Sequence, residues 1–224
     1  MKIVLLIPMK GNSERVSNKN MRDFAGKPLY HAVMNEMLKS RYISEIVINT
    51  DSDTIKTDVK NNFKNINLID RPKELIGDFV PMNDIIGYDI EKFDADFYIQ
   101  THSTNPLLLV STLDIAIEKF SDSNKNFDSL FSVTKIQSRL YWENGTAINH
   151  NPMELLRTQD LPIIYEENSC FYIFTKSSFK SSGNKRIGLN PFMFAIDKIE
   201  AQDIDELQDF IIAEQLYKQL RQKR

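Results

Sequence analysis

An unbroken apolar run near the start of the chain limits the fold more than any other feature. Residues 3–7 are five large aliphatic residues, Ile-Val-Leu-Leu-Ile. A strand that is apolar on both sides is typical of a parallel sheet covered by helices on both faces, because a strand with one wet face alternates polar and apolar residues. We therefore expect a buried parallel strand within a sheet.

Strand-like and helix-like segments alternate through the first half of the chain. The expected strands are residues 3–7, 45–50, 65–69 and 97–100, and the expected helices are residues 28–39, 83–91, 111–120 and one that begins at Asp53. This alternation is typical of an α/β fold in which helices cover both faces of a mostly parallel sheet. Ligands of such folds bind at the carboxyl ends of the strands. We predict a Rossmann-like sheet of this kind.

The rhythm changes after residue 128. Further strands are expected at 130–133, 171–174 and 192–196, and the chain ends in a helix whose apolar stripe consists of Leu207, Phe210, Ile211, Tyr217 and Leu220. The intervening segment contains Pro152, Pro162 and the turn dipeptide Asn144-Gly145. We interpret the segment at about 136–168 as an excursion from a single domain that spans residues 1–224.

The composition is that of an ordinary globular protein. The chain has 224 residues, of which 42% are hydrophobic and 26% charged, enough for one large domain. No run approaches the roughly 18 apolar residues of a membrane span, and the start of the chain lacks the small-residue cleavage site of a signal peptide. We expect a cytoplasmic protein with no membrane contact. A net charge of −3 disfavours binding to a nucleic acid polymer, and the single cysteine, Cys170, is expected to be a buried structural residue.

The loop after the first strand, residues 10–20, combines a glycine with three cations. Polyanions are bound by free backbone N–H groups and by positive side chains. Gly11 with Lys10, Arg15 and Lys19 can provide both. The loop is therefore a candidate site for the phosphates of a nucleotide. A solvated surface loop is the alternative, because Lys and Arg abound on protein surfaces.

Two aspartates separated by one residue, Asp203 and Asp205, precede the last expected helix. In extended chain, residues two apart point to the same side, so both carboxylates can bind one Mg²⁺ while Ile204 faces the core. Helix capping is the alternative interpretation. Asp205 with Gln208, and Asp203 with Glu206, have the spacing of capping pairs.

Two further polar residues follow expected strands at the edge where ligands bind. Asp51, after the strand at 45–50, is a candidate either for the N-cap of the next helix or for contact with a ribose or metal. His102 follows the strand at 97–100 and is surrounded by small polar side chains. We expect His102 to contact a substrate rather than to serve as a buried structural histidine.

Six blocks of sequence, in order along the chain, resemble one enzyme family. They are IPMKGNSERVSNKN (7–20) with FAGKPL (24–29), INTDS (48–52), RPKEL (71–75) with Asp78, TNPL (104–107), QDLP (159–162) with Tyr165 and Asn168, and DID (203–205) with Ala213 and Glu214. Together they are similar to acylneuraminate cytidylyltransferases, the CMP-sialic acid synthetases, and to their legionaminate and pseudaminate relatives. The resemblance implies a sheet of the nucleotide-diphospho-sugar transferase type and an excursion that mediates a homodimer.

The resemblance also implies an activity: CMP passes from CTP to the anomeric hydroxyl of an acidic 2-keto sugar, pyrophosphate leaves, and Mg²⁺ offsets the developing charge. The product serves surface glycan synthesis. The residues implied for the nucleotide are Lys10, Gly11, Asn12, Ser13, Arg15, Lys19, Asn20 and Arg71. Those implied for the metal are Asp203 and Asp205, with Lys10 and Lys19 as their catalytic partners, and those for the sugar are Gln100, His102, Thr104 and Asn168.

The chain departs from the family pattern at several positions. Lys10 replaces the usual arginine, which turns a planar two-pronged phosphate contact into a point charge. Glu14 replaces a lysine, His102 a glutamine, and Leu108 a frequent arginine. A shift of two residues in the alignment places Gln100 at the sugar instead. The remaining alternatives are an eight-carbon sugar acid or a phosphorylated small molecule as acceptor, and a CTP-binding protein without turnover.

Overall fold

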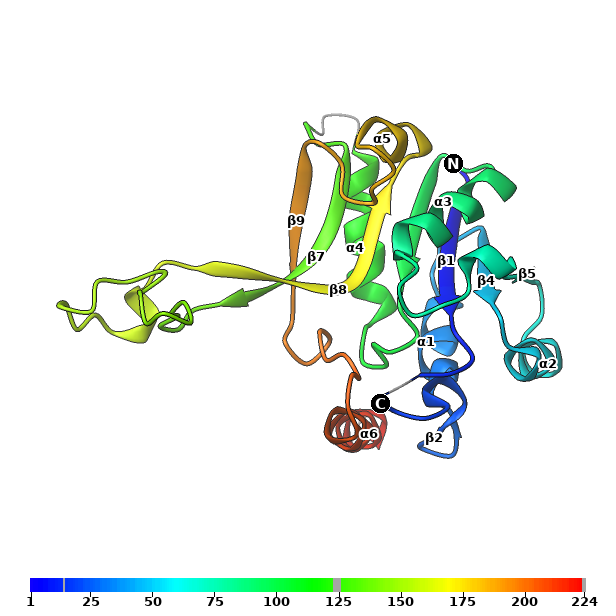
Figure 1. Cartoon of the computed structure of the whole chain (residues 1–224), viewed down its shortest axis with the longest axis horizontal. Helices are drawn as coiled ribbons and strands as arrows, with labels where there is room; N and C mark the ends of the chain where they lie inside the picture. Colours follow the sequence, from blue (N-terminus) through cyan, green and yellow to red (C-terminus); the bar gives the residue numbers. More distant parts are fainter. Residues whose placement is uncertain (14, 123–125, 223–224) are drawn as a thin grey trace.

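Seven strands form one sheet in this computed structural model, which describes residues 1–13, 15–122 and 126–222 (Figure 1). They are β1 (Ile3–Met9), β4 (Glu45–Thr50), β5 (Ile66–Asp70), β6 (Phe97–Thr101), β7 (Ser129–Ile136), β8 (Ile164–Phe174) and β9 (Pro191–Ile196). Their order is β5-β4-β1-β6-β8-β7-β9, and of these seven only β8 runs antiparallel to its neighbours. The predicted α/β fold with a mostly parallel sheet is confirmed.

Helices cover both faces of the sheet. They are α1 (Leu29–Met37), α2 (Asp53–Asn62), α3 (Met82–Lys92), α4 (Val110–Ser121), α5 (Lys176–Ser181) and α6 (Leu207–Gln222), and a short hairpin joins β2 (Asp23–Phe24) to β3 (Lys27–Pro28). None of the helices in the described part of the chain combines the length and apolar character needed to cross a membrane.

The first strand explains why both faces need a cover. Every residue of β1 is buried. Successive side chains of a strand point to opposite faces, so Ile3 and Leu5 pack in one core cluster with α1 and α4. Val4 and Leu6 pack in a second cluster with α3 and α5. The apolar run at the start of the chain thus forms the buried parallel strand that its sequence predicts.

The outer halves of β7 and β8 leave the sheet and form a long arm (Figure 1). The two strands pair from Ser129 with Phe174 to Ile136 with Ile164, and their register shifts between Phe131 and Val133. Residues 135–165, here called the arm, lie beyond the last pair of β7 with β9, Thr134 with Ile196, and project away from the helices that cover the sheet. The arm occupies the segment that was interpreted as an excursion from its composition.

The last helix packs by only part of the expected stripe. Phe210 and Ala213 of α6 are buried against the β2–β3 hairpin, where the Phe210 and Phe24 rings meet edge to face at 5.4 Å. Leu207 and Ile211, which were expected on the packed face, are exposed instead. On a helix with 3.6 residues per turn, positions 210, 213 and 217 share one face and 207 and 211 lie beside it. The hairpin therefore covers Phe210 and Tyr217 of the expected stripe and leaves Leu207 and Ile211 uncovered.

Candidate active site

A cavity of about 520 Å³ opens at the carboxyl ends of β1 and β6. This is the edge of a parallel sheet at which ligands bind. The predicted site residues that line it are Lys10, Ser13, Arg15, Lys19, Asn20, Arg71, His102, Thr104, Asp203 and Asp205. Residues from both ends of the chain therefore meet in one place, because the 10–20 loop and the segment before α6 close over the same edge.

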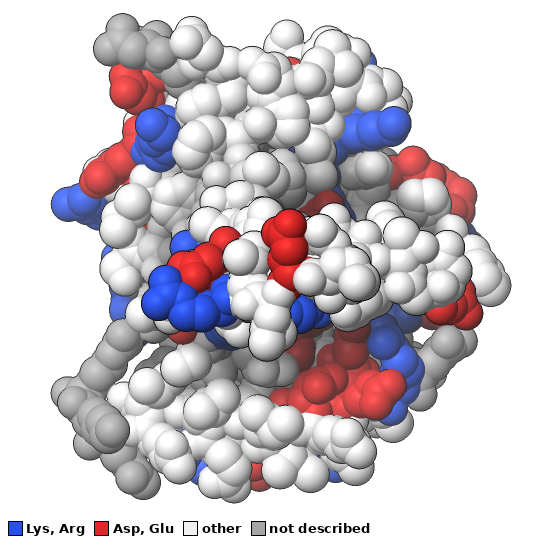
Figure 2. All heavy atoms as spheres, turned by 90° about the vertical axis from the view of Figure 1, so that its left-hand side faces the viewer, with Lys and Arg blue, Asp and Glu red and all other residues white. Residues whose placement is uncertain are grey.

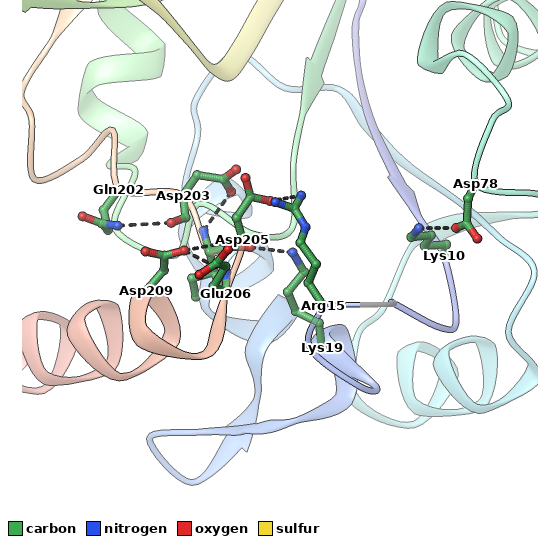
Figure 3. Close-up of polar contacts among 10 residues, drawn as sticks. Lys10, Arg15, Lys19, Asp78, Gln202, Asp203, Asp205, Glu206 and Asp209 are labelled. Atoms are coloured by element: carbon green, nitrogen blue, oxygen red, sulfur yellow. Dashed lines mark hydrogen bonds and ion pairs between the residues drawn. The ribbon is translucent and has the colours of Figure 1, made fainter.

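Two cations of the 10–20 loop form ion pairs at the mouth of the cavity (Figure 3). Lys10 Nζ lies 2.6 Å from Asp78 Oδ1, and Arg15 Nη2 lies 2.6 Å from Asp205 Oδ1. The four side chains are between 43% and 60% exposed. Exposed ion pairs contribute little to stability, so a polyanion can take the place of either carboxylate at small cost in free energy.

Lys19 is the most enclosed cation of the loop. Its Nζ donates to the backbone carbonyl of Ile204, between the two aspartates (Figure 3). Burial lowers the pKa of Lys19, while Asp203 and Asp205 act in the opposite direction. A positive charge is thus held directly beside the two carboxylates.

Gly11 packs closely against the turn after β4. Its N–H donates to Asp51 Oδ1 at 2.7 Å, and a Cβ at this position would lie 2.8 Å from Ser52 Cβ. Glycine alone avoids that clash. The Gly11 N–H is therefore hydrogen-bonded within the protein, where it ties the loop to the turn after β4. Asp51 does not cap α2, because Ser52 occupies the N-cap and accepts from the Ile55 N–H.

The rest of the loop contributes unequally to the cavity. Ser13 lines the cavity, whereas Asn12 is exposed and is not among the residues that line it. Asn20 is buried: its Nδ2 donates to the Lys10 carbonyl at 3.0 Å, and its Oδ1 accepts from Ser103 Oγ at 2.7 Å. Asn20 thus fixes the loop to the end of β6. Glu14 lies outside the described residues.

Arg71 is held in place by a chain of hydrogen bonds that sequence reasoning missed. Its Nε donates to Asn49 Oδ1 at 2.9 Å, and its Nη2 donates to the carbonyls of Met9 and Asn49 at 3.1 and 2.9 Å. Asn49 Nδ2 in turn donates to Asp89 Oδ1 at 2.5 Å. Asp89 is buried on α3, and burial raises its pKa to about 7 although Asn49 and Arg71 lower it. No local sequence signal links these three residues, which come from distant parts of the chain.

Asp203 and Asp205 both line the cavity, and the buried Ile204 between them faces the core as predicted. Burial raises the pKa of Asp203, and Asp205 adds to that effect while Thr104 opposes it. The two predicted capping pairs do not form. The carboxylate of Asp209 accepts from the N–H groups of Asp205 and Glu206 at 3.1 and 2.8 Å instead (Figure 3).

The predicted sugar-side residues fall into two groups. His102 and Thr104 line the cavity. Burial, together with Arg186 and Lys19, lowers the pKa of His102 to about 3, so the imidazole stays neutral at physiological pH. Gln100 is fully buried behind the wall, where its Oε1 accepts from Arg186 Nη1 at 2.7 Å.

Asn168 lies outside the described wall of the cavity. Its amide spans to β7: Oδ1 accepts from Ser132 Oγ at 2.6 Å, and Nδ2 donates to Thr134 Oγ1 at 3.0 Å. The following residue, Ser169, adopts a left-handed conformation with φ of 58° and lines the cavity. Asn168 therefore stabilises the irregular pairing of β7 with β8, and its contact with the sugar stays a prediction.

Arg186 is a cavity residue that sequence reasoning missed. It lies in the segment between α5 and β9, next to the exposed Lys185. A Lys-Arg pair in a polar segment has the composition of any solvated loop, so no sequence signal could have selected it. Only the fold brings this loop over the end of β6.

The sequence resembles named enzymes over nearly its whole length. Pseudaminic acid cytidylyltransferase of Campylobacter jejuni is 28% identical, with 97% of each chain covered. CMP-N,N'-diacetyllegionaminic acid synthase of Legionella pneumophila is 28% identical, with 96% of each chain covered. The predicted relationship to the acylneuraminate group is thereby confirmed.

The fold is shared with solved cytidylyl-transferring enzymes. The structure of CMP:2-keto-3-deoxy-manno-octonic acid synthetase complexed with CTP has a TM-score of 0.71 at 15% identity, covering 98% of this chain and 99% of that one. A family model described as cytidylyltransferase matches residues 4–223. This protein therefore belongs to the cytidylyltransferase family and is a nucleotidyltransferase.

Proposed function

We propose that this enzyme transfers CMP from CTP to the anomeric hydroxyl of an acidic 2-keto sugar of the nonulosonate class, for surface glycan synthesis. The observation that carries the proposal is a single cavity that contains both the cations of the 10–20 loop and the carboxylates of Asp203 and Asp205. A nucleoside triphosphate needs both kinds of group, cations for its phosphates and carboxylates for the metal that accompanies them. We place the reaction in the cytoplasm, where CTP is available.

In this proposal the nucleotide lies along the 10–20 loop. Lys10, Arg15 and Lys19 bind the triphosphate, since each lines the cavity, and the first two are held only by exposed ion pairs. Asn20 and Arg71 contact the nucleoside, since both line the cavity, and internal hydrogen bonds hold both side chains in place. Such fixed groups lose little entropy on binding.

Asp203 and Asp205 fit Mg²⁺. Both are oxygen donors on the cavity wall, and the charge of Asp205 raises the pKa of Asp203, a repulsion that a cation relieves. Mg²⁺ bound beside phosphate takes one or two carboxylates from the protein and its other ligands from phosphate oxygens and water. When bound, the ion would offset the negative charge that develops on the phosphates.

The proposed chemistry is one displacement at phosphorus. The anomeric hydroxyl oxygen forms a bond to the α-phosphorus of CTP, the bond from that phosphorus to the bridging oxygen breaks, and the hydroxyl proton passes to water. Lys10 and Lys19 stabilise the negative charge that accumulates on the departing pyrophosphate. Binding of both substrates in one cavity lowers the entropic part of the barrier.

The nonulosonate acceptor is supported by the relatives that the chain matches from end to end. The pseudaminic and legionaminic acid enzymes are covered over 97% and 96% of their length. By contrast, the match to 3-deoxy-manno-octulosonate cytidylyltransferase of Chlorobium phaeobacteroides covers 54% of this chain. An eight-carbon acid therefore belongs in the test as a competing acceptor.

We further propose that the arm mediates a homodimer. Large apolar side chains are exposed along it, namely Tyr141, Trp142, Ile148, Met153, Leu155, Leu156, Ile163 and Tyr165. Figure 2, in which the arm points towards the viewer, shows that uncharged residues make up most of this face. An exposed apolar surface of this extent is typical of a protein interface, and a second copy of the chain presents the same surface.

The acceptor panel tests the proposed function. The enzyme is incubated with CTP, Mg²⁺ and, separately, sialic, legionaminic, pseudaminic and 3-deoxyoctulosonic acids, and pyrophosphate release is measured. We expect release with at least one nine-carbon acid. Release with the eight-carbon acid alone would assign a different acceptor, and CTP binding without release from any acid would show a binding protein without turnover.

A matched pair of variants tests the carboxylates. Asp203→Asn should reduce pyrophosphate release at least 100-fold, as expected for loss of a group that holds the metal. Glu206→Gln is the control, because Glu206 lies three residues on, outside the described wall of the cavity. Equal activity of the two variants would show that Asp203 does not hold the metal and has a structural role instead.

A further inference from the structure

Arg186 places a positive charge on the side of the cavity away from the 10–20 loop. It lines the cavity from the segment between α5 and β9. Its guanidinium lies over β6 and β8, through contacts with Gln100 and Tyr172. The 10–20 loop instead follows β1, and β6 separates β1 from β8 in the sheet. A nucleotide bound along that loop leaves Arg186 facing the other substrate.

Neutral groups hold the guanidinium in a fixed orientation. Its Cζ lies 3.9 Å from the centre of the Tyr172 ring, a stacking contact. Nη1 donates to Gln100 Oε1 at 2.7 Å, and Nη2 lies 3.3 Å from the Tyr172 hydroxyl, which itself bonds to Glu167. None of the ion pairs among the described residues includes Arg186.

The fixed guanidinium has donors left for a ligand. Arginine carries five N–H donors, and Gln100 and Tyr172 occupy two of them. The N–H donors that remain form a planar fork, which can bind both oxygens of a carboxylate. His102, which lines the cavity just after β6, is neutral because its pKa is lowered to about 3. Arg186 therefore supplies the positive charge of the sugar side.

We propose that Arg186 binds the carboxylate of the acceptor sugar, with Gln100 and Tyr172 as its positioning residues. In a 2-keto sugar acid the carboxylate is attached to the carbon that bears the reacting hydroxyl. Anchoring the carboxylate therefore fixes the direction of that hydroxyl toward the nucleotide. This inference rests on the proposed function and adds to it the residue that selects an acid over a neutral sugar.

The test is steady-state kinetics with the acceptor identified by the panel. Arg186→Gln should raise the KM for the acceptor about 10- to 100-fold, the effect of losing a hydrogen-bonded charge pair. The KM for CTP should change less than about twofold, because the loop residues are untouched. Arg186→Lys should recover part of the loss. Lys185→Gln, at the exposed neighbour outside the described wall, should behave as wild type.

An acceptor analogue tests the same contact without a mutation. For wild-type enzyme, converting the acceptor carboxylate to an amide should raise the acceptor KM by about the same factor as the Arg186→Gln substitution. In Arg186→Gln, the same change of acceptor should raise the KM little further. An unchanged acceptor KM in Arg186→Gln, or an equal penalty for the amide in both proteins, would overturn the assignment. A phosphorylated acceptor preferred by wild type and lost in Arg186→Gln would assign the guanidinium to phosphate instead.

The outcomes separate this inference from the proposed function. If wild type releases no pyrophosphate with any sugar acid, both fail together. If wild type uses a sugar acid and Arg186→Gln uses it equally well, the inference alone fails. A normal KM for CTP shows that each variant is folded, so a loss confined to the acceptor reports on the contact.

Discussion

At the scale of single residues, Gly11 shows how closely the phosphate-loop candidate packs on its neighbour. A Cβ there would lie 2.8 Å from Ser52 Cβ. Gly11→Ala is therefore expected to lower the free energy of unfolding by about 1–3 kcal/mol, the usual effect of overpacking. The loop must also shift, so the KM for CTP should rise. Urea unfolding and initial rates measure the two effects.

Gly87→Ala in α3 is the matched control. A Cβ at this position would lie 3.6 Å from Phe179 Cε1, which is ordinary contact. Replacing a helical glycine by alanine stabilises a protein by about 0.5–1 kcal/mol. Unfolding of both variants at the same urea concentration would contradict the close packing of Gly11.

Some residue-scale assignments could not come from sequence. The spacing of Asp203 and Asp205 correctly predicts that both reach the cavity and that Ile204 is buried. Asn168 matches the family block but points its amide at β7, because the strand pairing is irregular there. Which side of a strand a residue faces depends on such shifts, and they leave no mark in the sequence.

At the scale of elements, Asn49 joins β4 to α3 and to the segment after β5. It accepts from Arg71 and donates to Asp89, which is buried with a pKa raised to about 7. An acid with a raised folded pKa keeps its proton in the folded state while the unfolded chain loses it. Between about pH 4 and pH 7 the free energy of unfolding should therefore fall as pH rises, by up to about 1.4 kcal/mol per pH unit.

Asp89→Asn removes the titrating group and keeps its shape. Urea unfolding of wild type and variant at pH 5, 6 and 7 should show a weaker fall for the variant. Arg71 and Asn49 are the charged and polar groups that act on Asp89, and both remain in the variant. Identical pH slopes in the two proteins would mean that Asp89 does not titrate in this range.

The elements themselves were largely predictable, for physical reasons. The strand at 45–50 was predicted with the bounds observed for β4, because Ile46, Val47 and Ile48 at its centre are apolar and β-branched. The exposed stripe of α6 was not predictable. Periodicity marks which positions of a helix are apolar, but the partner, here the β2–β3 hairpin, decides which of them are covered.

At the scale of the whole molecule, the arm is the feature that a single chain does not explain. Met153 and Leu155 are 90% and 93% exposed in it. If the arm joins two copies, wild type should sediment as two 26.0 kDa chains, and Met153→Ser with Leu155→Ser should shift it toward one. Ile115→Ser, an exposed apolar residue on α4, is the control. A monomeric wild type would contradict the proposed dimer.

Identification of the reaction product tests the central claim most directly. After incubation with CTP, Mg²⁺ and the preferred sugar acid, mass spectrometry and phosphorus NMR establish what has been joined. We predict CMP linked through its phosphate to the anomeric oxygen of the sugar, with one pyrophosphate formed for each CMP-sugar. Pyrophosphate accompanied by free CMP, or no product from any acidic sugar, would contradict the account.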